Sequence, residues 1–297
     1  MTEQAADNSA GVPRGFRIGP VFNCSFGIYG RNFLPFFAVC AIITSPSLYF
    51  ARNTAASTAP ESTTGALSIT PVTFDSAFWM MAIGGGLVGL VVRTLAQALV
   101  YDAAFQDMRG RPASFRESMH RVLTRLAPII SLAVGLGVMI VAPWAGLWIA
   151  LYVARSSGMI GFSTQHFLIL GLGALLLIVN MAFVWVLAVV SIPVCLIENL
   201  GPIASFWRSA ALTKGYRWRI FAVFSLVAGI SWAIGWALSA LLTEGATMAA
   251  GPRMTALLAF LLDAISLGFL AVVTIVIYRD LRVAKEGIDA DPIVIAG

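Results

Sequence analysis

Six long apolar runs constrain the fold of this chain more than any other feature. Each run has about 20 residues or more, which is the length that an α-helix needs to cross a hydrocarbon core of about 30 Å. Only 11% of the 297 residues are charged and 59% are hydrophobic, whereas a soluble domain carries about 25% charged residues. The sequence therefore predicts an all-α, polytopic membrane helical bundle. Its six transmembrane helices are expected at residues 33–51, 77–101, 127–153, 167–196, 220–243 and 254–278.

The segments that connect these runs alternate in charge. Of the 19 Lys and Arg residues, 15 fall in the N-terminal segment, the second and fourth connections and the C-terminal segment, and three fall in the other connections. Because basic residues near span ends stay in the cytoplasm, both termini are predicted to be cytoplasmic. Residues 1–17 are then a disordered tail, residues 18–282 a single membrane domain, and residues 283–297 a second tail. Few Lys and many Ala, Gly and Arg are typical of a GC-rich bacterial genome, so the predicted location is the bacterial cytoplasmic (inner) membrane.

The basic connection at residues 197–219 is predicted to contain a short helix at the membrane surface. Pro202 suits the first turn of this helix and Gly215 suits its end. Apolar residues recur at i, i+3, i+4 and i+7 and make one stripe, while Ser205, Arg208 and Ser209 face away from it. A basic helix with an aromatic face tends to lie in the membrane interface. The stripe consists of Ile203, Phe206, Trp207 and Ala210.

Two other cytoplasmic segments repeat this pattern. One helix is predicted to start at Pro112, and another to start at Pro20 and end at Gly30. The chain then has three interfacial amphipathic helices, each followed by two spans. Three parallel copies of one unit explain this order, and the common hairpin construction of membrane proteins is the alternative. The stripes are Phe115, Met119, Val122 and Leu126, with Arg116, His120, Arg121 and Arg125 outside it, and Phe22, Phe26 and Tyr29.

Two stretches resemble a known family of bacterial membrane proteins. They are "SIPVCLIENLGPIASFWRSAALTKGYRWRIF" at residues 191–221 and "VIYRDLRVAKEGID" at residues 276–289. The family is named for the membrane domain that is sometimes fused to glycerophosphoryl diester phosphodiesterases. The resemblance implies an uncharacterised six-span membrane protein. The residues that match the family motifs are Glu198, Arg208, Lys214, Gly215, Tyr278, Asp280, Leu281, Arg282, Lys285, Glu286 and Gly287.

The family name implies no diesterase activity for this chain. A diesterase barrel needs about 250 residues, and the only histidines, His120 and His166, lie on opposite sides of the predicted membrane. The sequence also contains no nucleotide-binding loop, no metal-ligand spacing and no nucleophile–base pair. We therefore expect no enzymatic activity, cofactor, metal or nucleic-acid partner. Cys24, Cys40 and Cys195 are interpreted as small buried apolar residues rather than reactive thiols.

Ionisable residues inside the spans are the main candidates for a functional site, because charges at membrane depth are costly. Arg93 lies in the second span, with Gln97 one turn along the same face, and Asp263 lies in the sixth span. The depths of Arg93 and Asp263 differ by about 5 Å, so an ion pair is plausible. It is interpreted as a structural clamp between two helices or as a proton or substrate site. Alternatively, Arg93 reaches the headgroups and Asp263 is protonated or lies near water.

Three other residues inside the spans have structural interpretations. Asn180 in the fourth span is expected to form an interhelical hydrogen bond. Pro143 and Pro193 are expected to kink their helices.

The expected function is a non-catalytic membrane domain that engages membrane lipids or a partner protein. The alternative is a small-molecule or lipid transporter in which Arg93, Gln97 and Asp263 line a path. Basic cytoplasmic residues can bind anionic headgroups, although the positive-inside bias alone also explains them. The sequence does not indicate an oligomeric state. The candidate headgroup residues are Arg116, Arg121, Arg125, Arg208, Lys214, Arg217 and Arg219.

Overall fold

The computed structural model describes residues 18–58, 76–111, 115–156, 164–245 and 251–287. Within these ranges the chain forms helices and no strand, which confirms the all-α class. The predicted tail at residues 1–17 and most of the second tail lie outside the described residues. The described helices are α1 (Ile18–Arg31), α2 (Phe33–Thr58), α3 (Ser76–Met108), α4 (Phe115–Thr124), α5 (Leu126–Ser156), α6 (Thr164–Ala188), α7 (Ser191–Ile197), α8 (Pro202–Thr213), α9 (Arg217–Gly245) and α10 (Gly251–Glu286).

In the described part of the chain, five helical segments are long and apolar enough to cross a membrane. A sixth is counted only if α1 and Phe33–Pro46, which meet at a bend of 81°, form one span together. The chain is therefore a helical membrane protein with five or six spans, whereas the sequence predicted six. The five segments are Gly84–Met108, Leu126–Leu147, Gly171–Ile197, Arg217–Leu238 and Leu257–Glu286.

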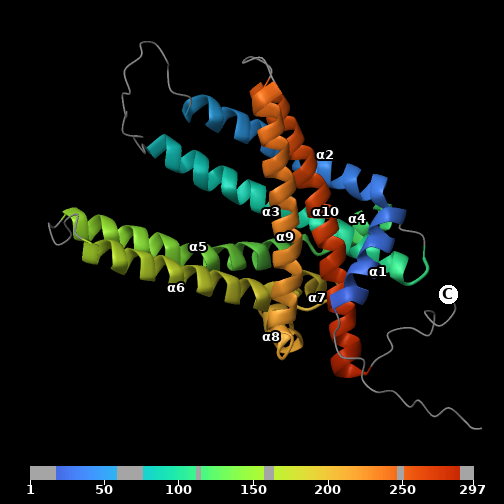
Figure 1. The fold of residues 1–297 in the computed structure, drawn as a ribbon. Helices are drawn as coiled ribbons and strands as arrows, with labels where there is room; N and C mark the ends of the chain where they lie inside the picture. The colour runs from blue at the N-terminus through green and yellow to red at the C-terminus, as the bar shows by residue number, and fades with distance from the viewer. Residues whose placement is uncertain (1–17, 59–75, 112–114, 157–163, 246–250, 288–297) are drawn as a thin grey trace, which may run out of the picture.

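The long helices form three antiparallel hairpins, α2 with α3, α5 with α6 and α9 with α10. Figure 1 shows these hairpins diverging from a common region that also contains the short helices α1, α4, α7 and α8. The three hairpins therefore converge at one end and separate toward the other.

Helices α3 and α10 form the centre of the protein. They pack against each other and against α2. In an apolar window of 18 residues within each span, 56% of the residues are buried for Leu257–Glu286 and 50% for Gly84–Met108, compared with 17% for Leu126–Leu147. Hairpin α5/α6 accordingly exposes large apolar side chains such as Val138 and Leu176. A surface of this kind is stable against lipid rather than water.

The fourth span, Gly171–Ile197, is interrupted by a two-residue turn between α6 and α7. Helix α6 ends at Ala188, and α7 begins at Ser191. Pro193 explains the break, because it has no N–H to donate to the carbonyl four residues earlier. The interruption lies at the position where a kink at Pro193 was predicted, while α5 continues through Pro143, so a bend at either proline remains a prediction. Side-chain hydroxyls satisfy two carbonyls at the break, because Ser191 donates to Ala188 O and Ser209 of α8 donates to Leu187 O at 2.6 Å.

Substituting Ser209→Ala should destabilise this junction. The fully buried hydroxyl of Ser209 joins α8 to α6, and its loss leaves the Leu187 carbonyl without that donor. We expect the free energy of unfolding to fall by about 1–3 kcal/mol, measured by SDS-induced unfolding in detergent. The matched control is Ser131→Ala, because the exposed Ser131 hydroxyl bonds only within its own helix. Equal stability of the two variants would contradict the proposed role of Ser209.

Helix α8 has the predicted boundaries and the predicted two faces. Pro202 occupies its first turn, and it ends just before Gly215. Ile203 and Trp207 are exposed, whereas Ser205 on the opposite face is fully buried against the protein. Phe206, another member of the stripe, packs partly against the core, so only the side of the stripe with Ile203 and Trp207 is exposed.

The predicted stripes of the other two short helices are only partly correct. Helix α4 exposes Met119 but buries Val122, and α1 exposes Phe26 but buries Tyr29. Each stripe therefore turns partly into the protein, because these helices also pack on α3 or α10. Helix α1 starts two residues before Pro20, and Pro112 lies outside the described residues. The threefold repeat and the interfacial location remain predictions.

Candidate functional site

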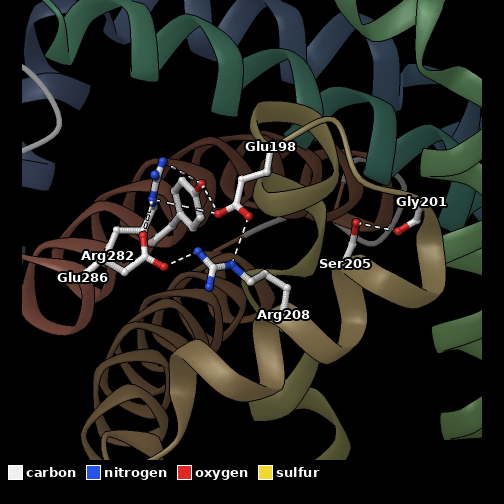
Figure 2. Close-up of polar contacts among 7 residues, drawn as sticks. Glu198, Gly201, Ser205, Arg208, Arg282 and Glu286 are labelled. Carbon is white, nitrogen blue, oxygen red and sulfur yellow. Dashed lines mark hydrogen bonds and ion pairs between the residues drawn. The ribbon is translucent and has the colours of Figure 1, made fainter. Parts of the chain in front are cut away.

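Five of the residues for which the sequence predicted a family resemblance meet in one ion-pair cluster, composed of Glu198, Arg208, Tyr278, Arg282 and Glu286 (Figure 2). Arg208 of α8 lies between two carboxylates, with Nε 3.0 Å from Glu198 Oε2 and Nη2 on Glu286. Tyr278 of α10 donates to Glu198 Oε1 at 2.9 Å. Arg282 donates from Nε to Glu286 Oε2 at 3.2 Å.

The ion-pair cluster joins α8 to the end of α7 and to the last turns of α10. It contains two arginines and two glutamates, so its formal charges balance. Although partial burial opposes the charge of Arg208, its hydrogen bonds to Glu198 and Glu286 raise its pKa above the ordinary value. Both carboxylates of the cluster already accept from protein donors. We interpret the cluster as a structural clamp that fixes α8 on the bundle.

Three other residues of the predicted family resemblance, Asp280, Lys214 and Gly215, lie outside the ion-pair cluster. Gly215 follows α8 with a φ of +93°, a left-handed conformation that glycine adopts without strain. Asp280 lies away from the cluster, near Cys24 of α1. Lys214 caps the C-terminal end of α8.

Arginines also tie the other short helices to carboxylates of α3. Arg31 at the end of α1 lies 2.9 Å from Asp107, and Arg121 of α4 lies 3.0 Å from Asp102. Arg125 donates to the carbonyl of Asn199 at 3.1 Å. Among the predicted headgroup residues, Arg121, Arg125 and Arg208 therefore bind oxygen atoms of the protein, and Arg217 and Arg219 lie against aromatic rings.

Arg93 and Asp263 form a bidentate ion pair between α3 and α10. Nη1 lies 2.8 Å from Asp263 Oδ2, and Nη2 lies 3.0 Å from Oδ1. The two side chains are 47% and 40% exposed. The sequence anticipated this pair from the depths of the two residues, and its geometry matches a clamp between the two central helices.

A pocket of about 430 Å³ lies where the three hairpins converge. Its walls are mainly apolar, and the rings of Trp185 and Phe224, 4.6 Å apart at their centroids, form one side. Gln97 lines this pocket, whereas Arg93 and Asp263 do not. The polar side chains in its wall are Thr94, Gln97, Tyr101, Ser225 and Thr274.

The broken fourth span borders the same pocket. Ala188, Val189 and Ile192 contribute to its lining. Non-helical backbone at membrane depth is tolerated only where it is buried in protein or lines a cavity, and this break has that position. Asn180, by contrast, lies exposed on α6 and has no hydrogen-bond partner among the described residues, so its predicted interhelical bond is not formed there.

Sequence reasoning did not find this pocket. Its lining comes from α3, α5, α6, α7, α9 and α10, and most of these residues are apolar like the rest of the spans. Only Gln97 stood out, as a polar residue within a span. Thr94, Ser225 and Thr274 are also polar residues within spans, but they indicated a site less strongly than Gln97.

Comparison of the chain with family models, curated proteins and solved structures finds no match. The family resemblance of the two motif stretches therefore remains a prediction.

Proposed function

We propose that this membrane protein binds a lipid non-catalytically, with an acyl chain held in the pocket between the hairpins. The observation that carries the proposal is the pocket itself, whose volume of about 430 Å³ lies within the range of about 300–1,000 Å³ for small-molecule sites. Its apolar walls match an acyl chain better than a charged solute.

The polar residues of the pocket support a ligand with an uncharged polar group. Gln97 and Ser225 offer an amide and a hydroxyl, and the pocket wall contains no ionisable acid or base other than Tyr101. An ester carbonyl or a hydroxyl at the end of an apolar chain can accept or donate such bonds.

The surroundings of the pocket support entry from the bilayer. Ser225 and Ala228 of α9 line the pocket and are exposed. Leu226 and Ile230 on the same helix are exposed apolar side chains. A lipid can therefore reach the pocket without crossing an aqueous layer.

Filling the pocket should prevent lipid binding. We expect Ala228→Trp to lower photolabelling of the pocket helices by a lipid with a diazirine in its acyl chain by about tenfold or more, equivalent to about 1.4 kcal/mol or more. The labelled residues are identified by mass spectrometry of the full chain in nanodiscs.

The matched control is Ala233→Trp, because Ala233 is exposed on the same helix but does not line the pocket. This variant should retain the labelling of the original protein. Equal labelling of both variants, or labelling confined to the outer faces of α5 and α6, would refute the proposed lipid site.

One observation favours a second function, the transport of the bound lipid. The break between α6 and α7 borders the pocket, and broken spans form substrate sites in many transporters. A transport path along Arg93, Gln97 and Asp263 has less support, because only Gln97 lines the pocket. Movement of fluorescent lipid between leaflets of proteoliposomes distinguishes transport from binding alone.

A further inference from the structure

We propose that Lys214, Arg217 and Lys285 form a site for the phosphate group of an anionic membrane lipid. This inference rests on the proposed function, because it assigns the headgroup of the lipid whose acyl chain the pocket holds. We call these three residues the basic site.

The three residues of the basic site come from three neighbouring elements, because α10 packs against both α8 and α9. Lys214 caps α8, Arg217 begins α9, and Lys285 lies in the last turn of α10. The ammonium group of Lys285 donates to the carbonyl of Ala211, three residues before Lys214. The charges of Lys214 and Arg217 lie close enough to act on Lys285.

The positive charge of the basic site is not balanced by the protein. Nearby Arg208 is paired with both Glu198 and Glu286. In contrast, none of the carboxylates in the described ranges forms an ion pair with Lys214, Arg217 or Lys285. Three neighbouring cations repel one another, and a bound anion removes that repulsion.

Arg217 also has unused hydrogen-bonding capacity. Its Nε atom is buried without an acceptor, and its guanidinium lies 5.3 Å from the ring centroid of Phe183. The aromatic ring holds one face of the guanidinium, and the buried Nε is out of reach of a ligand, so the terminal Nη groups are the donors left for a phosphate. A guanidinium with this freedom can bind the oxygens of a phosphate in a bidentate manner.

The basic site and the pocket are separated by a distance that one phospholipid spans. Ser225 follows Arg217 by eight residues in α9, so it lies about 12 Å further along the helix. Thr274 precedes Lys285 by 11 residues in α10, or about 16 Å. Trp218 beside Arg217 is 84% exposed, which is typical of the headgroup level.

The test compares binding of phosphatidylglycerol and phosphatidylcholine to the purified full chain by native mass spectrometry. We expect the double variant Lys214→Gln/Lys285→Gln to reduce the preference for phosphatidylglycerol by about thirtyfold, since each of the two basic residues contributes about 1 kcal/mol to anionic lipid binding. Adding Arg217→Gln should remove the preference. Unchanged thermal unfolding of each variant shows that the fold is intact.

The matched control is Arg109→Gln/Arg111→Gln, which removes two exposed charges from the turn that follows α3 and lies outside the candidate headgroup residues. It should leave the preference within about twofold. If both double variants lose the preference equally, the protein attracts anionic lipid through diffuse surface charge and the basic site is refuted. If inorganic phosphate at equal concentration displaces phosphatidylglycerol, the natural ligand is a soluble phosphate compound and the lipid assignment is wrong.

This experiment distinguishes a failure of the proposed pocket from a failure of the proposed basic site. Ala228→Trp should weaken both lipids alike, because it blocks the acyl chain. Lys214→Gln/Lys285→Gln should weaken only the anionic lipid. A preference for phosphatidylglycerol that survives the loss of all three cations overturns the basic site without affecting the proposed pocket.

Discussion

Replacing Arg208 with Gln is expected to lower the free energy of unfolding by about 2–3 kcal/mol. The substitution leaves Glu198 and Glu286 without the guanidinium between them. Breaking a fully buried ion pair costs about 3–5 kcal/mol, and solvent reduces that cost here because about a third of the Arg208 side chain is exposed. SDS-induced unfolding of the purified protein measures the change.

A double-mutant cycle tests whether this loss comes from the ion-pair cluster. The double variant Arg208→Gln/Glu286→Gln should lose less stability than the sum of the losses of the two single variants. The reason is that the double variant leaves neither charge of this pair without its partner. Arg116→Gln is the matched control, and we expect its effect to stay within about 0.5 kcal/mol. Additive effects of Arg208→Gln and Glu286→Gln would mean that the two residues are not coupled.

Neutralising one partner of the Arg93–Asp263 pair is the second large perturbation. Asp263→Leu leaves Arg93 at membrane depth without its carboxylate, and a lone charge there costs about 2.5–3.5 kcal/mol. We expect Arg93→Met to destabilise the protein similarly. The double variant Arg93→Met/Asp263→Leu should return to within about 1 kcal/mol of the original protein, because apolar residues often replace an ion pair at little cost.

The same variants distinguish a clamp from a ligand site. Arg93 and Asp263 do not line the pocket, so the double variant should retain lipid photolabelling. If the double variant folds stably but loses lipid binding or transport, the pair has a functional role beyond joining α3 to α10.

Much of the fold could be predicted from the sequence, because the relevant signals are local. The apolar runs predicted the long helices to within a few residues at most ends, and the interruption between α6 and α7 lies where a kink at Pro193 was predicted. Gly215 marked the end of α8 for a local reason as well, since its φ of +93° favours glycine. The pairing of Arg93 with Asp263 followed from depth alone, because a helix rises about 1.5 Å per residue.

The candidate site was less predictable, because its residues are far apart in the chain. The hydroxyl of Tyr278 bonds to the carboxylate of Glu198 across 80 positions, and no spacing rule connects them. The buried serines of α8 were predicted to face away from its stripe, but the pattern did not show that this face packs on α6.

The sequence by itself determined the class, the helices and their ends, because hydrophobic length, proline and glycine act within a few residues of the chain. Only the tertiary structure decided where the hairpins cross. That crossing brings Gln97 and Trp185 to one pocket, Arg208 between two glutamates, and Lys214, Arg217 and Lys285 to one place. The reason is physical: apolar spans can pack at many angles with similar burial, so the choice among them depends on contacts between distant segments.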